Sequence, residues 1–316
     1  MKQTLLGLIL AISSGLASAQ YPSKPIRFIV GFPPGGSADP TTRIIGQALS
    51  ERMGQPVVVE NRPGADSALA TEQVSKMSPD GYTIMFASNS GMTAAVALRK
   101  QPLYDPLKDF TPISLVGRAT QIFYVHPSVP ARTLKEFIEY ARANPGKLNY
   151  GTGNPLSILY NVQLMKATGI NMVHVPYKGE GPLNPDIIAG RVQSAFLSTA
   201  TAISLAKEGK LRPLAVLLER RSPLLPHVPT MDEAGVPEVT ARQWAGVFGP
   251  PNMPREIVER LNKEVNAALK RPDVLEKLQG YGYAAEGSTP ERLLEINRAD
   301  LELWRRLVKE AGIPLE

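Results

Sequence analysis

The sequence predicts an α/β protein made of two lobes, each built around its own sheet. Short β-branched runs alternate with segments of helical periodicity along the chain, a pattern typical of βαβ units and mostly parallel sheets. The chain has 316 residues, more than one compact lobe needs. It contains no cysteine, which excludes disulfides, a cysteine-based zinc site and a thiol nucleophile. Packed apolar surface must therefore stabilise both lobes.

The first 19 residues have the pattern of a secretory signal peptide. Lys2 gives a short positive region, an apolar run follows at 5–12, and Ala17-Ser18-Ala19 is a small-x-small cleavage site. No second apolar run reaches the roughly 20 residues that a membrane-spanning helix needs. We therefore expect residues 1–19 to be removed and the mature chain, starting near Gln20, to be located in the periplasm.

The charge balance is mildly basic. The chain has 35 Lys and Arg against 29 Asp and Glu, and loss of Lys2 leaves 34 against 29, a net charge of +5. Basic and acidic residues are interspersed along the helical stretches, as at 255–270, so a solvated surface is favoured over a nucleic-acid stripe. We expect no nucleic-acid partner and a modest attraction for anions.

The expected elements fall into two successive groups. The first has strands at 27–32, 57–60 and 83–87, with helices that end at Gly54 and near 77. The second begins with a strand at 122–125 and a helix whose start is marked by a capping box from Thr133 to Glu136. Further strands are expected near 148–150, 173–175, 192–196 and 214–218.

The last part of the chain can be read in two ways. A strand at 246–248 leads into an amphipathic helix from about 255, and a closing helix opens near Ser288 and carries an apolar stripe through Trp304. The residues alone leave open whether this part forms a third domain or returns to the first lobe.

The segment 31–40 is the first candidate binding loop. It joins the first strand to the first helix, where open α/β sheets bind ligands, and Gly35 and Gly36 let its backbone approach a ligand closely. The amides from Gly35 to Asp39 can face an anion. The segment lacks both phosphate-binding fingerprints, so a carboxylate fits better than a nucleotide. Asp39 before Pro40 also fits a helix N-cap.

Three other strand-to-helix loops are small, polar and glycine-rich: 88–91, 151–154 and 177–181. On two lobes, such loops would line a cleft with amides and hydroxyls. Each loop alone is equally explained by ordinary turn chemistry.

Residues that could support catalysis are not arranged for it. His126, His174 and His227 have no metal-ligand spacing, and no Gly-x-Ser-x-Gly elbow is present. Lys178 lies in a polar loop, where a lysine is solvated more often than it forms a Schiff base. The sequence therefore favours a binding protein over an enzyme.

Several motifs in a fixed order resemble one family. They are Val-Gly-Phe-Pro-Pro-Gly-Gly at 30–36 with Asp39 and Arg43, Gly-Gln-Pro-Val-Val-Val-Glu-Asn-Arg-Pro-Gly-Ala at 54–65, Pro-Asp-Gly-Tyr-Thr at 79–83 and Val-His-Val-Pro-Tyr-Lys-Gly at 173–179. The chain thereby resembles the Bug-type, or TctC-like, solute-binding proteins of tripartite tricarboxylate transporters, over nearly all of its mature length.

The resemblance implies a type II periplasmic-binding-protein fold, with two doubly wound lobes, a hinge and a ligand cleft between them. The chain would cross between the lobes near Gln121 and near Trp244. Lobe 1 would comprise residues 20–121 and 245–316, and lobe 2 residues 122–244. The C-terminal helices would then return to lobe 1.

The resemblance also implies the binding site. The first loop would receive a carboxylate through backbone amides and ordered water, and loops of the second lobe would hold the rest of the ligand. The expected ligand-binding residues are Phe32, Pro34, Gly35, Gly36, Ser37, Ala38, Asp39, Ser88, Asn89, Ser90, Thr152, Gly153, Asn154, Ser157, Tyr177, Lys178, Gly179, Leu197 and Ser198. No metal or organic cofactor is expected.

The implied function is a monomeric periplasmic receptor for a small aromatic or aliphatic mono- or dicarboxylate. It would deliver this ligand to a large and a small membrane permease subunit. An extracytoplasmic sensor for a signalling system is an alternative with the same binding module, and an exported hydrolase is a third possibility.

The sequence departs from the family at three pocket positions. Asp66-Ser67-Ala68-Leu69-Ala70 stands where Gly-Gly-x-Ile-Gly is common, Ile158-Leu159 replaces a common Ser-His pair, and Leu197 replaces an Asp. If Ile158, Leu159 and Leu197 form an apolar wall, aromatic or short aliphatic acids would bind better than citrate or amino acids. The alternative is that these side chains point into the lobe core.

Overall fold

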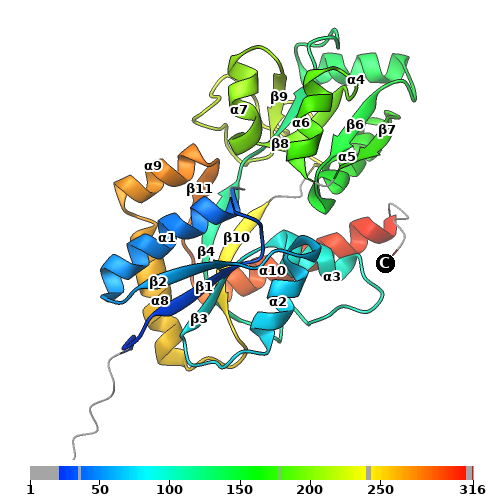
Figure 1. The fold of residues 1–316 in the computed structure, drawn as a ribbon. Helices are drawn as coiled ribbons and strands as arrows, with labels where there is room; N and C mark the ends of the chain where they lie inside the picture. Colours follow the sequence, from blue (N-terminus) through cyan, green and yellow to red (C-terminus); the bar gives the residue numbers. More distant parts are fainter. Residues whose placement is uncertain (1–20, 35–36, 178, 240–242, 311–314, 316) are drawn as a thin grey trace, which may run out of the picture.

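The computed structural model describes residues 21–34, 37–177, 179–239, 243–310 and 315. Figure 1 shows two lobes, each with a sheet flanked by helices. The strand order is β11-β4-β10-β3-β1-β2 in the first sheet and β7-β6-β8-β5-β9 in the second. The prediction of a two-lobed α/β protein is confirmed. The expected signal peptide, residues 1–19, lies outside the described residues.

The first lobe takes its elements from both ends of the chain. Its first part contains β1 (Ile26–Val30), α1 (Ala38–Met53), β2 (Val57–Asn61), the 3₁₀ turn η1 (Ala65–Ser67), α2 (Ala68–Ser75), β3 (Thr83–Ser88), the π-helical turn η2 (Ser90–Ala94), α3 (Ala95–Ala97) and β4 (Thr111–Ala119). Its second part contains β10 (Trp244–Gly249), α8 (Arg255–Ala268), α9 (Pro272–Gly280), β11 (Tyr283–Ala285) and α10 (Pro290–Glu310). The C-terminal part therefore joins the first sheet and forms no third domain.

The second lobe uses the middle of the chain. Its elements are β5 (Gln121–Val125), α4 (Leu134–Ala143), β6 (Asn149–Thr152), α5 (Pro155–Thr168), β7 (Val173–Pro176), α6 (Glu180–Ile188), β8 (Ser194–Ser198), α7 (Thr199–Lys207) and β9 (Arg212–Val216). Thr133 caps α4 as predicted, because its hydroxyl accepts a 3.1 Å hydrogen bond from the Glu136 amide. The Glu136 carboxylate accepts from the Arg132 amide at 2.6 Å, so the reciprocal half of the predicted capping box is not formed with Thr133.

Both sheets are mixed, whereas the sequence pattern predicted mostly parallel sheets. β1 pairs in parallel with β2 and β3, but β10 runs antiparallel between β3 and β4. In the second sheet β5 runs antiparallel to β8 and β9. β5 and β10, the strands that follow the two crossings, run antiparallel to both of their neighbours. The sequence patterns missed β4, which contains Pro112 and Gly117, and the three-residue β11.

The two crossings between the lobes are hydrogen-bonded to each other. The Ala119 amide donates to the Gln243 carbonyl at 3.0 Å, and the side chains of Gln121 and Gln243 are joined at 2.6 Å. Between them, the Thr120 amide donates to the Gly282 carbonyl at 2.7 Å, and the Thr120 carbonyl accepts from the Thr199 amide at 3.2 Å. Thr120 therefore contacts elements of both lobes, while the lobe limits given above stay a prediction.

Helix α10 provides a second connection. Trp304, Leu307 and Val308 of α10 are buried in the same apolar cluster as Leu156 and Tyr160 of α5. Lys166 of α5 and Glu310 of α10 form an ion pair at 2.6 Å. A helix of the first lobe thus packs directly on the second. Over the described ranges, no helix combines the length and apolar character needed to cross a bilayer.

The contact between Gly282 and Thr199 gives a test of the crossing. A Cβ added at Gly282 would lie 2.7 Å from the Thr199 Cβ, and Gly282 has a φ of +79°. We expect Gly282→Ala to lower the free energy of unfolding by about 1 to 3 kcal/mol more than its control, because the added methyl overpacks the contact.

The control is Gly209→Ala, whose φ of +72° is similar and whose added Cβ would meet no atom within 4 Å. Urea unfolding of both variants separates the backbone cost from the clash. Equal losses in the two variants would show that Gly282 and Thr199 are not held together.

Candidate functional site

The loop after β1 is packed against the turn after β2. A Cβ added at Gly31 would lie 2.1 Å from the Ser67 hydroxyl oxygen, and one added at Gly91 would lie 3.2 Å from the same atom. Ser67 is buried and has a φ of +76°, which is costly for any residue other than glycine. Ser67 therefore joins the three loops that follow β1, β2 and β3, although the sequence analysis did not place it in the site.

Asp39 holds the first loop in place. It lies in the first turn of α1, and its carboxylate accepts hydrogen bonds from the Arg43 guanidinium at 3.0 Å and the Asn61 amide at 2.9 Å. Asn61 also donates to the Phe32 carbonyl at 3.1 Å. The expected N-cap role of Asp39 is wrong, since the helix begins at Ala38, two residues earlier than an Asp39 cap would start it, and Ser37 occupies the N-cap without a side-chain bond.

The other residues expected in the first loop differ in exposure. Phe32 and Ser37 are half-buried, Ala38 is buried and Pro34 is exposed. Burial raises the pKa of Tyr283, whose hydroxyl lies within hydrogen-bonding reach of Ser37. Gly35 and Gly36, the centre of the expected anion loop, lie outside the described residues, as does Lys178 of the second lobe.

The loop after β3 is polar and buried. Ser88 and Ser90 are 3% and 7% exposed, Asn89 is fully buried, and the Ser88 hydroxyl has no hydrogen-bond partner. The chain then forms the π-helical turn η2, a geometry often found at functional sites. The Tyr104 hydroxyl donates to the Gly91 carbonyl and anchors this turn. A ligand or water that reaches Ser88 would satisfy its hydroxyl.

Asp300 of α10 lies beneath this loop. The Thr93 hydroxyl donates a 2.6 Å hydrogen bond to its carboxylate. Burial raises the pKa of Asp300 to about 6, although Thr93, Trp244, Asn89 and, at longer range, Arg118 each favour the ionised form. The Trp244 indole N–H faces this carboxylate without a hydrogen bond of good geometry.

In the second lobe, Thr152 supports the histidine of the next strand. Thr152 Oγ1 lies 2.7 Å from His174 Nε2, and the His174 ring stacks on Tyr150 with centroids 5.0 Å apart. Burial lowers the pKa of His174, which favours its neutral form. His174 lies exposed on the edge strand β7 and stacks on Tyr150.

Asn154 and Ser157 cap helix α5. The Asn154 side chain accepts from the Ser157 amide at 2.9 Å, and the Ser157 hydroxyl accepts from the Asn154 amide at 3.3 Å. Pro155 follows the cap at N1, as expected for a helix start. These two side chains, which we expected to contact ligand, form the capping box themselves.

Two glycine loops of the second lobe touch through their backbones. A Cβ added at Gly153 would lie 2.6 Å from the Gly179 carbonyl carbon and 2.7 Å from the Glu180 amide nitrogen. Glu180 in turn accepts from the Ser198 amide at 3.0 Å and from its hydroxyl at 2.7 Å. The ends of β6, β7 and β8 therefore meet at one place.

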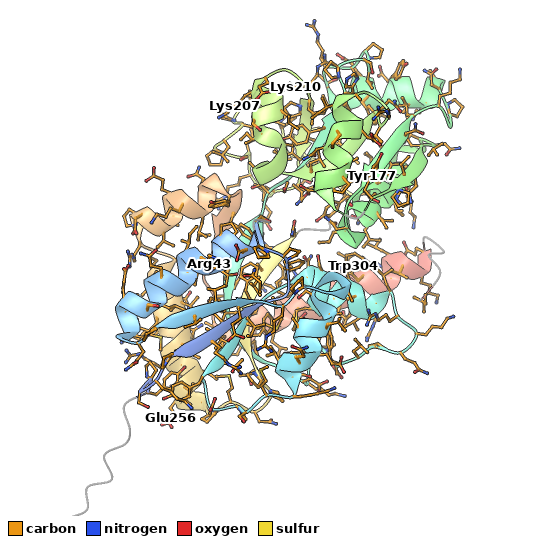
Figure 2. All side chains as sticks on the ribbon, viewed as in Figure 1. Arg43, Tyr177, Lys207, Lys210, Glu256 and Trp304 are labelled. Atoms are coloured by element: carbon orange, nitrogen blue, oxygen red, sulfur yellow. The ribbon has the colours of Figure 1, made fainter. Side chains whose placement is uncertain are left out.

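Tyr177 belongs to the same group of loops. Its amide donates to the Thr152 carbonyl at 2.8 Å, and its hydroxyl donates to the Asp186 carboxylate at 2.7 Å. That hydrogen bond, together with Arg191, lowers the pKa of Asp186. Figure 2 shows Tyr177 on the second lobe and Arg43 and Trp304 on the first, all near the region between the lobes, whereas Glu256 lies at the far end of the first lobe.

Leu197 does not face a ligand. It is 0% exposed and packs with Ile122, Tyr124 and Leu183 in the core of the second lobe. Leu159 is also a core residue, and only Ile158 is partly exposed. The apolar wall expected from these three residues is therefore not formed, because the β8 pleat and the α5 helix turn Leu197 and Leu159 inward.

The sequence analysis missed the residues that hold the loops together. Asn61, Ser67, Glu180 and Asp300 act through contacts between segments distant in sequence. One sequence signal was available, since Ser67 stands where the family often has glycine. The described residues contain no group of three or more His, Cys, Asp or Glu side chains that could hold a metal ion. The arrangement offers hydroxyls and backbone amides suited to holding an anion.

Sequence comparison finds close matches over nearly the whole chain. A family model described as "Tripartite tricarboxylate transporter family receptor" matches residues 41–313. A UPF0065 protein in the tcbD-tcbE intergenic region of Pseudomonas sp. strain P51 is 35% identical over 317 residues, covering 98% of this chain and 94% of that protein. Protein BugT of Bordetella pertussis is 32% identical over 320 residues, covering 99% and 98%.

Solved structures match the fold with similar coverage. Rhodopseudomonas palustris Rpa4515 with adipate has a TM-score of 0.84 at 32% identity and covers 94% of this chain and 100% of that chain. The periplasmic binding protein BugD has a TM-score of 0.79 at 31% identity with the same coverage. MatC from R. palustris with bound malate has a TM-score of 0.77 at 29% identity, covering 91% and 100%.

The left-handed backbone of Ser67 gives a stability prediction. We expect Ser67→Gly to raise the free energy of unfolding by about 0.5 to 1 kcal/mol, because glycine adopts this conformation without strain. The control is Ala68→Gly next to it, where φ is −60° and the helix begins. That variant should lose about 1 kcal/mol in urea unfolding. A loss in both variants would mean that Ser67 contributes more by packing than it costs in strain.

Burial of Asp300 gives a pH prediction. The unfolded carboxyl titrates near pH 3.9, so the folded protein binds more protons between about pH 4 and 6 and loses stability as the pH rises through this range. Asp300→Asn removes this titration. The free energy of unfolding of the wild type relative to Asp300→Asn should therefore fall by about 2 to 3 kcal/mol between about pH 4 and pH 7.

The control for this pH effect is Glu302→Gln, an exposed acid on the same helix. Its stability should follow that of the wild type across the same range. A constant difference between wild type and Asp300→Asn at both pH values would show that Asp300 does not titrate there.

Proposed function

This chain belongs to the tripartite tricarboxylate transporter receptor family, and on that basis we propose that it is the periplasmic receptor that captures an aliphatic dicarboxylate for a membrane permease. The family resemblance noted in the sequence is confirmed. The family and its solved relatives are substrate-binding proteins, so this chain is a binding protein and not an enzyme. The hydrolase alternative is thereby removed.

Two solved relatives with bound acids support the proposed class of ligand. Adipate in Rpa4515 and malate in MatC are both aliphatic dicarboxylates. An aromatic acid has less support, because the apolar wall that would have favoured it consists largely of core residues. We therefore infer that the ligand of this chain has two carboxylates joined by a short aliphatic chain.

Two sets of loops would hold the two ends of such a ligand. One carboxylate would meet the loops after β1 and β3, where Ser88 offers a buried hydroxyl. The other would meet the backbone amides around Gly153 and Gly179. The described residues in the proposed site carry no cationic side chain, so their amides and hydroxyls would contribute about 1.5 to 3 kcal/mol for each hydrogen bond to a charged group.

The family's role in a tripartite transporter supports the rest of the proposal. A large and a small permease subunit would receive the ligand, and residues 1–19 would direct export to the periplasm. Release of the ligand to the permease would follow separation of the two lobes.

Calorimetry with adipate and malate tests the ligand class. The protein is first unfolded and refolded to remove bound ligand. We expect saturable one-to-one binding of at least one of the two acids, and at about 100 times its Kd the ligand should stabilise the protein by about 2.7 kcal/mol. Absence of binding to adipate, malate, succinate and citrate would contradict the proposed function.

Gly153→Ala tests the second-lobe half of the site. The added Cβ would collide with the backbone at Gly179, so the two loops must separate. We expect the Kd for the bound acid to rise about 10-fold to 100-fold, which corresponds to about 1.4 to 2.8 kcal/mol. Gly181→Ala is the control, since its Cβ would meet no atom within 4 Å. An unchanged Kd in folded Gly153→Ala would move the site away from these loops.

A further inference from the structure

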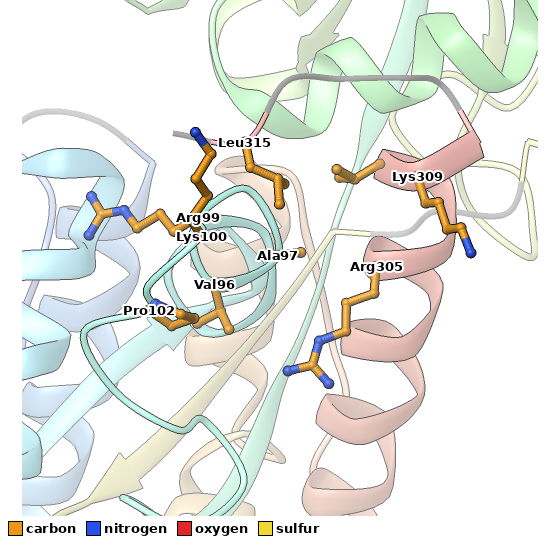
Figure 3. Close-up of a pocket in the computed structure, with 9 residues that line it drawn as sticks. Val96, Ala97, Arg99, Lys100, Pro102, Arg305, Lys309 and Leu315 are labelled. Atoms are coloured by element: carbon orange, nitrogen blue, oxygen red, sulfur yellow. The ribbon is translucent and has the colours of Figure 1, made fainter.

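A basic depression lies on the first lobe, between α3 and the C-terminal half of α10 (Figure 3). Its volume is about 660 Å³. Arg99 and Lys100 line it on the side of α3, and Arg305 and Lys309 line it on α10. None of the residues proposed to bind the carboxylate ligand lines this depression, so it is a separate surface.

Within the part of the chain that the structure describes, the four cationic side chains have no acidic partner. No ion pair or side-chain hydrogen bond joins any of them to another described residue, and no acidic residue is among those lining the depression. Other cations of α5 and α10 are paired, as Lys166 is with Glu310 and Arg292 with Glu295. Four like charges around one hollow repel each other, and a negatively charged partner would relieve this repulsion.

The floor of the depression is apolar. Val96 and Val308 line it and are both buried, with Pro102 at the side. Arg305 and Lys309 lie four residues apart on α10 and so share one face of the helix. The surface therefore combines cations at the rim with an apolar floor, the composition expected for docking a protein segment that carries both acidic and apolar side chains.

Helix α10 contributes residues both to the depression and to the apolar contact between the two lobes. Val308 lines the depression and also belongs to the cluster that Trp304 and Leu307 form with α5 of the second lobe. Ala97 of α3 belongs to both in the same way. A partner seated here would contact the residues whose packing must change if the lobes separate.

We propose that this basic depression is the docking site for an acidic segment of the membrane permease. The proposal rests on the proposed function, since it assumes that the receptor delivers its ligand to such a permease. Docking beside the interlobe cluster would let the permease bind the closed, ligand-carrying receptor and the open, empty receptor with different affinities.

The test measures binding of the whole protein to the cognate permease subunits in nanodiscs of zwitterionic lipid, with and without adipate. Arg305→Glu with Lys309→Glu should weaken binding about tenfold or more at low salt, and added NaCl should reduce the difference because it screens the charges. Arg99→Glu with Lys100→Glu, on the opposite wall, should have the same effect.

The matched control is Lys263→Glu with Lys270→Glu, the same change of charge at two exposed, unpaired lysines of the α8 segment. It should bind the permease like wild type. All variants should bind adipate with unchanged Kd in calorimetry, so failure of ligand binding in the wild type would count against the proposed function alone.

Three results would overturn the docking proposal. The first is equal binding of the depression variants and the control to the permease. The second is equal loss of binding to empty nanodiscs that contain phosphatidylglycerol, which would show that the surface recognises an anionic lipid. The third is a second adipate site in the wild type that the Arg305 and Lys309 variant lacks, which would identify the depression as a small-anion site.

Discussion

Strand β10 is the element on which the other features depend. All of its residues are buried, and it pairs antiparallel with β3 on one side and β4 on the other. Without it, the first sheet would separate into β2-β1-β3 and β4-β11, because no other strand joins the two parts. β10 begins directly after the second crossing between the lobes, with Ala245 opposite Ser88 and Trp244 beside Asp300. The register of one strand therefore positions the interlobe connection, the β3 loop and the buried carboxylate beneath it.

Most polar side chains around the proposed site hold the loops in place. Asp39 bonds Arg43 and Asn61, Asn154 and Ser157 cap a helix, and Ser198 bonds Glu180. These side chains are satisfied by partners from the protein, as burial requires, whereas the buried Ser88 hydroxyl is left without one. Among the described residues, the groups left for a ligand are backbone amides and a few hydroxyls, which suit a carboxylate.

If the basic depression docks the permease as proposed, helix α10 connects ligand capture with that docking. One of its faces packs on the second lobe through Trp304 and Leu307, its buried Asp300 contacts the η2 turn, and its Arg305 and Lys309 line the basic depression. These three contacts lie within about three turns of one rigid element. A change in the packing of Trp304 against the second lobe would therefore move Arg305 and Lys309 directly, because all three residues lie on one helix.

The sequence alone determined the α/β class, the two lobes, the family and the loops at the strand ends, because hydrophobic periodicity, turn residues and ordered motifs are local signals. Thr133 capped its helix as predicted, since an N-cap bond spans only four consecutive residues. Side-chain roles were decided by the tertiary structure. Leu197 turned into the core, Asp39 bonded Asn61, and Ser67 took a glycine-like conformation between Gly31 and Gly91, all through partners distant in sequence. The antiparallel insertion of β10 and the contact between α10 and α5 were likewise fixed only when the chain packed, because no local pattern specifies which distant strand or helix an apolar face will meet.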